Sequence, residues 1–125
     1  MSMILVIEDN PINTKYIVAV LQSAGHRVTT AEDAAAGILM ARETLPDLIF
    51  MDVQLPGMDG LEATRQLKAD AATRHIPIYA LTALAMKGDE ERIRAAGCDG
   101  YLPKPVSYKN LLATTASVGA APEAQ

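Results

Sequence analysis

The stretch LIFMDVQLPGMDG, residues 48–60, places one acidic side chain, Asp52, directly after four large apolar residues. The apolar run predicts a β-strand, the third along the chain. A carboxylate beside such a run is costly to bury unless a partner stabilises its charge. Asp52 is therefore either a polar residue that ends the strand or a group placed there to react.

Short apolar runs and helical patterns alternate on both sides of this stretch. Strands are predicted at residues 3–7, 26–31, 48–52, 76–83 and within 100–105, and helices at residues 11–24, 33–43, 61–70, 87–97 and 107–117. Five strands alternating with five helices predict an α/β fold with a parallel sheet covered on both faces. Right-handed crossovers favour a doubly wound, flavodoxin-like arrangement with strand order 2-1-3-4-5.

Length and composition limit the classes of protein to consider. The chain has 125 residues, half of them apolar, so it can build one hydrophobic core. We expect one domain over residues 1–118 and a flexible tail at 119–125. The net charge of −4 argues against nucleic-acid binding by bulk electrostatics, and no apolar run is long enough for a membrane span. The lone Cys98 and an N-terminus unlike a signal peptide predict a cytoplasmic protein.

Polar side chains follow four of the five predicted strands. Glu8 and Asp9 follow the first, Asp52 ends the third, Thr82 lies at the end of the fourth and Lys104 at the end of the fifth. In a parallel sheet these side chains share one edge, where three carboxylates repel one another and one ammonium cannot neutralise them. Oxygen ligands without a His or Cys cluster suggest Mg²⁺. A carboxylate nucleophile, Mg²⁺, a hydroxyl and a lysine form a set suited to phosphoryl transfer.

Each of these residues also has an ordinary structural interpretation. Glu8 and Asp9 could favour a helix N-terminus, and Asp52 could be a turn residue. Thr82 could cap a loop, and Lys104 could be a solvated surface lysine. Because all five fall after the correct strands, their combination favours the functional interpretation.

With these residues at these positions, the chain resembles the receiver domain of bacterial two-component response regulators, the CheY-like family. The resemblance covers about residues 3–116 and rests on the motifs VIEDN, MDVQLPGMDG, ALTA and YLPKP. The stretch TALAMKGDEERIRAAGCDGYLPKP is most similar to DivK-type stand-alone receivers, and it is also similar to receivers attached to hybrid histidine kinases.

The resemblance implies that Asp52 accepts a phosphoryl group from a phosphohistidine on a sensor histidine kinase or a histidine phosphotransfer protein. Mg²⁺ would be bound by Asp9, Asp52 and the backbone carbonyl of Gln54, with Glu8 acting through water. Thr82 and Lys104 would contact the phosphoryl oxygens. Such a protein is a signalling phosphoacceptor that assists its own phosphorylation and dephosphorylation, and is not otherwise an enzyme.

The resemblance also implies a switch and an output surface. Tyr101 would be the rotating aromatic residue that reports phosphorylation to the face built from the fourth helix, the fifth strand and the fifth helix. Output would then be contact with a downstream protein or relay of the phosphoryl group, without direct contact with nucleic acid or membrane. Lys104–Pro105 is a candidate for a cis peptide bond. We further expect Gln54 and Leu84 to influence the lifetime of the acyl phosphate by controlling water access.

Three other functions could use an aspartate nucleophile or the same fold. Hydrolases of the haloacid dehalogenase type need a second Asp two residues after the nucleophile, where this chain has Gln54. A nucleotide- or flavin-binding module should carry a Gly-rich signature after its first strand, and EDNPIN contains no glycine. A receiver that works as a scaffold in either phosphorylation state remains an alternative.

Overall fold

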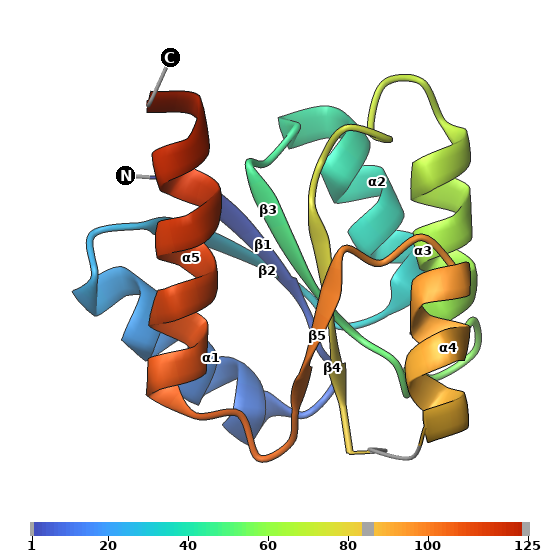
Figure 1. Ribbon diagram of the computed structural model, residues 1–125, viewed down its shortest axis with the longest axis horizontal. Helices are drawn as coiled ribbons and strands as arrows, with labels where there is room; N and C mark the ends of the chain where they lie inside the picture. Colours follow the sequence, from blue (N-terminus) through green and yellow to red (C-terminus); the bar gives the residue numbers. More distant parts are fainter. Residues whose placement is uncertain (1, 84–86, 124–125) are drawn as a thin grey trace.

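The computed structural model describes residues 2–83 and 87–123, and its strands and helices alternate along the chain (Figure 1). The strands are β1 (Met3–Ile7), β2 (Arg27–Ala31), β3 (Leu48–Asp52), β4 (Ile78–Thr82) and β5 (Gly100–Pro103). The helices are α1 (Pro11–Ser23), α2 (Ala34–Thr44), α3 (Gly60–Ala69), α4 (Lys87–Ala95) and α5 (Tyr108–Glu123). In the described part of the chain, no helix has the length and apolar character that crossing a membrane requires.

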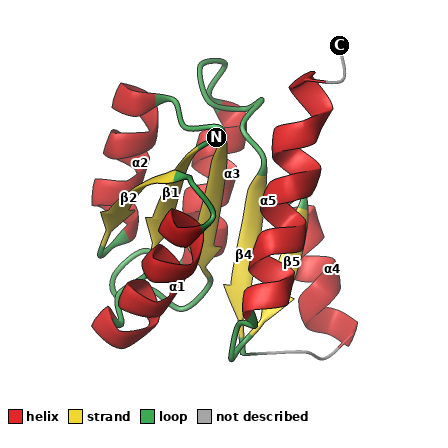
Figure 2. Cartoon of the chain, turned by 90° about the vertical axis from the view of Figure 1, so that its left-hand side faces the viewer, coloured by secondary structure: helices red, strands yellow, loops and turns green. Residues whose placement is uncertain are grey.

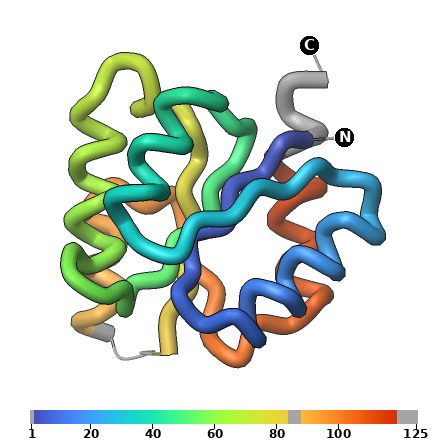
Figure 3. The backbone as a smooth tube through the Cα atoms, turned by 180° about the vertical axis from the view of Figure 1, so that it is seen from behind, coloured from blue at the N-terminus to red at the C-terminus, as the bar shows by residue number. Residues whose placement is uncertain are grey.

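The five strands form one parallel sheet in the order β2-β1-β3-β4-β5, which confirms the predicted fold. Helices α1 and α5 cover one face of the sheet, and α2, α3 and α4 cover the other (Figures 1 and 2). Figure 3 follows the chain from α1 through the edge strand β2 to α2. Because β1 lies beside β3, residues that follow β1 meet the end of β3 at the centre of the sheet.

Alternate residues of the central strands build two separate cores. Leu5 and Ile7 of β1 belong to the cluster under α2, α3 and α4, whereas Ile4 and Val6 belong to the cluster under α1 and α5. The apolar run in β3 divides in the same way, and every residue of that strand is buried. The predicted coverage of both sheet faces therefore follows from uninterrupted apolar runs with side chains alternating between them.

The helices begin within one residue of their predicted starts, and the largest difference lies at the C-terminal end of the chain. The Asn10, Asp33 and Asp59 side chains cap α1, α2 and α3 by accepting backbone N–H bonds. Helix α5 continues to Glu123, beyond the predicted end at residue 117, so the segment predicted as a tail begins in helical conformation. The extension contains Gly119 and Pro122, so helix propensity does not explain it. The expected flexibility of residues 119–125 stays a prediction.

Candidate functional site

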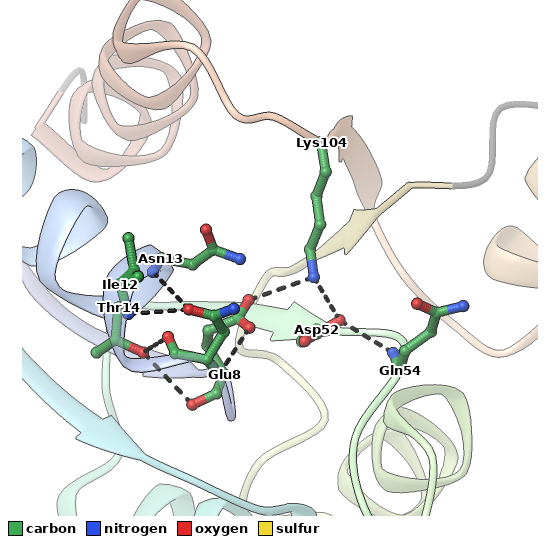
Figure 4. A network of polar contacts seen from close by, with 8 residues as sticks. Glu8, Ile12, Asn13, Thr14, Asp52, Gln54 and Lys104 are labelled. Atoms are coloured by element: carbon green, nitrogen blue, oxygen red, sulfur yellow. Dashed lines mark hydrogen bonds and ion pairs between the residues drawn. The ribbon is translucent and has the colours of Figure 1, made fainter.

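The first part of the site is the turn between β1 and α1. Glu8 is 2 % exposed, and Asp9 beside it is exposed. The Asn10 backbone N–H donates to Glu8 Oε1 (3.1 Å), while the Asn10 side chain accepts from Ile12 N–H and Asn13 N–H (Figure 4). The N-cap residue of α1 therefore also fixes the orientation of the buried glutamate.

Asp52 is the last residue of β3 and is 1 % exposed. Its Oδ1 atom accepts the Gln54 backbone N–H at 3.0 Å and lies 2.9 Å from Lys104 Nζ (Figure 4). The carboxylate that the sequence singled out is thus buried at the carboxyl edge of the sheet. Its charge is stabilised by an ammonium and a backbone donor.

Lys104 reaches the site from the end of β5. Its backbone N–H donates to the Thr82 carbonyl at 2.8 Å, and the Lys104–Pro105 peptide bond is cis, as predicted. The ammonium lies between two acids, 2.9 Å from Asp52 Oδ1 and 3.4 Å from Glu8 Oε2. Burial acts to lower the pKa of Lys104, but hydrogen bonding and charge attraction to Asp52, and then to Glu8, outweigh it and raise the pKa. Lys104 therefore remains positively charged.

Glu8 is the most strongly perturbed acid described. Burial raises its pKa most, followed by Asp52, which favours protonated Glu8 by accepting its hydrogen bond and disfavours charged Glu8 by repulsion, and together they bring the pKa to about 7. The Asn10 N–H and the Lys104 charge act in the opposite direction without outweighing these causes. Near neutral pH the negative charge on Glu8 is therefore costly without a further cation.

The three acids form a group that could hold a metal ion. One carboxylate oxygen from each of Glu8, Asp9 and Asp52 lies within 4.8 Å of the others. Within the described residues, the buried Glu8 Oε2 atom receives no hydrogen bond, although Lys104 lies 3.4 Å away. A buried oxygen that lacks a donor, in an all-oxygen cluster, fits a hard divalent cation such as Mg²⁺. The predicted metal site therefore has a suitable donor set.

The other predicted site residues divide into three groups. Thr82 is buried at the end of β4, beside the strand that carries Asp52. Tyr101 is half-buried and packs against the core under α2, α3 and α4. The side chain of Gln54 is exposed, and Leu84 lies outside the described residues.

Sequence reasoning missed two features of the site. The Asn10 backbone N–H binds Glu8, a contact that the sequence pattern does not indicate. Gly60 was passed over, although a side chain there would collide with the backbone of Asp52. The sequence did contain a sign of this close approach, because Gly60 directly follows the N-cap residue Asp59, at a position where nearly any other residue is a better helix former.

Comparisons with known proteins agree on one family. The profile of the response regulator receiver domain matches residues 4–116. The polar-differentiation response regulator DivK of Brucella anthropi is 44% identical over 114 residues, 91% of this chain and 93% of that protein.

Two solved structures extend the comparison to the fold and the site. The receiver domain of the sensor histidine kinase PA1611 from Pseudomonas aeruginosa, described with magnesium coordinated in its active-site cleft, is 40% identical with a TM-score of 0.88. The match covers 94% of this chain and 98% of that one. The chemotaxis response regulator CheY4 of Vibrio cholerae is 29% identical with a TM-score of 0.89, over 94% and 98% of the two chains.

Proposed function

The chain belongs to the response regulator receiver family of two-component signalling, and on that premise we propose that Asp52 is its phosphoacceptor. The observation that supports the assignment most is the surroundings of Asp52. A buried carboxylate lies at the carboxyl edge of the sheet, 2.9 Å from Lys104 Nζ and beside two further acids. The phosphoryl donor is a phosphohistidine on a histidine kinase or phosphotransfer protein.

The proposed metal site uses Asp9, Asp52 and the Gln54 carbonyl as ligands, with Glu8 acting through water. Mg²⁺ bound there would neutralise charge that develops on the transferring phosphoryl oxygens. Burial and the nearby Asp52 charge make three negative charges in this cluster costly, and a divalent cation bound there would offset that cost.

The residues of the chain then divide the remaining work. An Asp52 oxygen forms a bond to phosphorus while the phosphorus–nitrogen bond to the donor imidazole breaks, which leaves an acyl phosphate. Lys104, held charged beside Asp52, stabilises negative charge on the phosphoryl oxygens. We assign the Thr82 hydroxyl to a second phosphoryl contact because Thr82 ends the strand next to Asp52.

We further propose that Tyr101 couples this chemistry to the α4-β5-α5 face. Tyr101 lies in β5, three residues before Lys104, and the Lys104 N–H bond to Thr82 joins the ends of β5 and β4. A movement of Lys104 or Thr82 toward the phosphoryl group therefore acts on the strand that carries Tyr101. We propose that this face contacts a downstream protein and that output involves neither nucleic acid nor membrane. We also propose that the receiver domain spans residues 1–118 and that the protein is cytoplasmic.

The donor protein is proposed to dock over a cleft beside the ammonium. The cleft has a volume of about 450 Å³ and is lined by Glu8, Ile12, Asn13, Tyr16, Ile17, Lys104, Pro105 and Val106. Two of its lining residues, Ile12 and Tyr16, are large hydrophobic side chains that are 77% and 42% exposed. An apolar surface beside a charged reaction centre suits a protein partner that must bring a phosphohistidine to Asp52.

The test is intact mass after incubation with acetyl phosphate, with and without Mg²⁺. We expect the wild type to gain one phosphoryl group when Mg²⁺ is present and Asp52→Asn to gain none. Asp33→Asn is a matched control, because Asp33 caps α2 and asparagine caps equally well. A gain that persists in Asp52→Asn would contradict the assignment, as would a wild type that neither acetyl phosphate nor a phosphorylated kinase can modify.

A further inference from the structure

Helix α3 begins with a glycine whose presence the helix itself does not explain. Gly60 follows the N-cap residue Asp59, and its backbone is not among the left-handed positions of the described chain. Glycine is a poorer helix former than alanine, so helix propensity argues against it here. The reason must lie in what surrounds the position.

The surroundings of Gly60 are the backbone of the acceptor strand. A Cβ atom at position 60 would overlap the carbonyl oxygen of Asp52 and would lie 2.9 Å from its carbonyl carbon and 3.0 Å from Val53 Cα. At Gly37 and Gly100 the nearest atoms belong instead to the side chains of Ile7 and Tyr79. Side chains can rotate away from an added methyl group, whereas the Asp52 backbone cannot.

Hydrogen bonds hold this backbone from both sides. The Gly60 N–H donates to the Val53 carbonyl at 3.0 Å, and the Val53 N–H donates to the Leu81 carbonyl of β4 at 3.1 Å. The buried Thr64 hydroxyl donates to the Gly60 carbonyl at 2.8 Å and fixes the first turn of α3. Val53, the residue after Asp52, is thus held between α3 and β4, and a displacement of this residue strains one of these bonds.

We propose that Gly60 is a positioning residue for the phosphoacceptor. Its missing side chain lets α3 approach the Asp52–Val53 peptide, which sets the Asp52 carboxylate relative to Lys104 and sets the direction of the chain toward Gln54. Asp52 and Gln54 are both proposed to bind Mg²⁺, so an added methyl group at Gly60 alters metal affinity as well as stability. This inference rests on the proposed function where it concerns Mg²⁺.

The test compares Gly60→Ala with Gly100→Ala in the full chain. Both changes add one methyl group in a crowded place, but Gly100 lies at the start of β5, where the added atom meets the Tyr79 ring. Mg²⁺ affinity is measured by isothermal titration calorimetry at a temperature where circular dichroism shows each variant folded. We expect Gly60→Ala to weaken Mg²⁺ binding by about tenfold or more, and Gly100→Ala to change it by less than about twofold.

A second measurement needs no metal. The Gln54 N–H donates to Asp52 Oδ1, so its amide resonance in an NMR spectrum recorded in EDTA reports the position of the carboxylate. We expect this resonance to move in Gly60→Ala and to stay in place in Gly100→Ala. Unchanged Mg²⁺ affinity together with an unmoved resonance would overturn the inference. If the wild type binds no Mg²⁺, the proposed function is wrong, while the Gln54 resonance still decides the positioning role.

Thr64→Val covers the case in which Gly60→Ala does not fold. This change preserves volume but removes the hydrogen bond that fixes Gly60, so the first turn of α3 can move away from β3. The expected result is a smaller displacement of the same Gln54 resonance and a loss of Mg²⁺ affinity of about threefold. A Thr64→Val protein that matches the wild type in both measurements would count against the proposal.

Discussion

Replacing Glu8 by glutamine should stabilise the metal-free protein, and the gain should depend on pH. The unfolded chain ionises Glu8 near its ordinary pKa of 4.5, whereas the folded chain ionises it at about 7. Between these values the folded state binds one proton more than the unfolded state, so the free energy of unfolding falls as pH rises. At 1.36 kcal/mol per pH unit, the interval from 4.5 to about 7 corresponds to about 3 kcal/mol.

Glutamine occupies the same volume and can still accept the Asn10 N–H, but it carries no charge that must be buried. In EDTA, the free energy of unfolding of Glu8→Gln should therefore exceed that of the wild type by up to about 3 kcal/mol at about pH 8, and the difference should nearly vanish at about pH 4, below the unfolded pKa. Lys104 does not interfere, because its raised pKa lies above this range and its stabilising contribution is lost only at higher pH. The lowered pKa of His26 affects both proteins alike.

The assay is urea unfolding followed by circular dichroism at several pH values, in EDTA and in Mg²⁺. Mg²⁺ should stabilise the wild type more than Glu8→Gln, because a ligand that binds only the folded state adds RT ln(1 + [L]/Kd). Glu62→Gln is the matched control on an exposed glutamate that pairs with Arg65, and its effect should stay below about 0.5 kcal/mol. A Glu8→Gln effect that is absent at high pH, or equal at all pH values, would refute the reasoning.

Three further changes probe the site and its support. Lys104→Met removes the cation between two acids and should cost about 3 kcal/mol of unfolding free energy in EDTA, against almost nothing for the exposed Lys109→Met; equal denaturation curves for the two variants would contradict this. Gly37→Ala should lower the free energy of unfolding by about 2 kcal/mol, because the new methyl group meets the Ile7 side chain. Adding Ile7→Val to the same chain should recover part of that loss, so strictly additive changes in unfolding free energy would argue against the contact. Ile12→Ala should slow phosphotransfer from a phosphorylated kinase severalfold while acetyl phosphate still modifies the variant at the wild-type rate, and a loss with both donors would move the role of Ile12 from docking to chemistry.

The fold was largely predictable because its strands leave few alternatives. Uninterrupted apolar runs such as Met3–Ile7 and Leu48–Met51 require cover on both faces, and right-handed crossovers then determine most of the strand order. The same logic placed Glu8, Asp52 and Lys104 at one edge of the sheet. Their meeting is a consequence of topology, which the sequence pattern expresses strongly.

Close packing was less accessible than topology. By helix propensity alone, Gly37 destabilises α2. The structure shows instead that α2 lies so close to β1 that a methyl group at position 37 would overlap the Ile7 side chain. The extension of α5 to Glu123 was also missed, because Gly119, Pro122 and the lack of an apolar stripe favour a tail over a helix. The raised pKa of Glu8 depends on burial and on its distance from Asp52, and neither quantity can be obtained from residue order.

The arrangement around Lys104 links these observations to signalling. Without a metal or phosphoryl group, Lys104 faces both Glu8 and Asp52, and burial keeps the charge on Glu8 costly. In the proposed phosphorylated state, Asp52 carries about −1.5 to −2 charges in place of −1, so the attraction of Lys104 shifts toward the phosphoryl oxygens. Because the Lys104 N–H is bonded to the Thr82 carbonyl, that shift acts on the ends of β4 and β5 together. Full reversal of a two-state population requires about 5.5 kcal/mol, which several charge-assisted hydrogen bonds at this edge can supply.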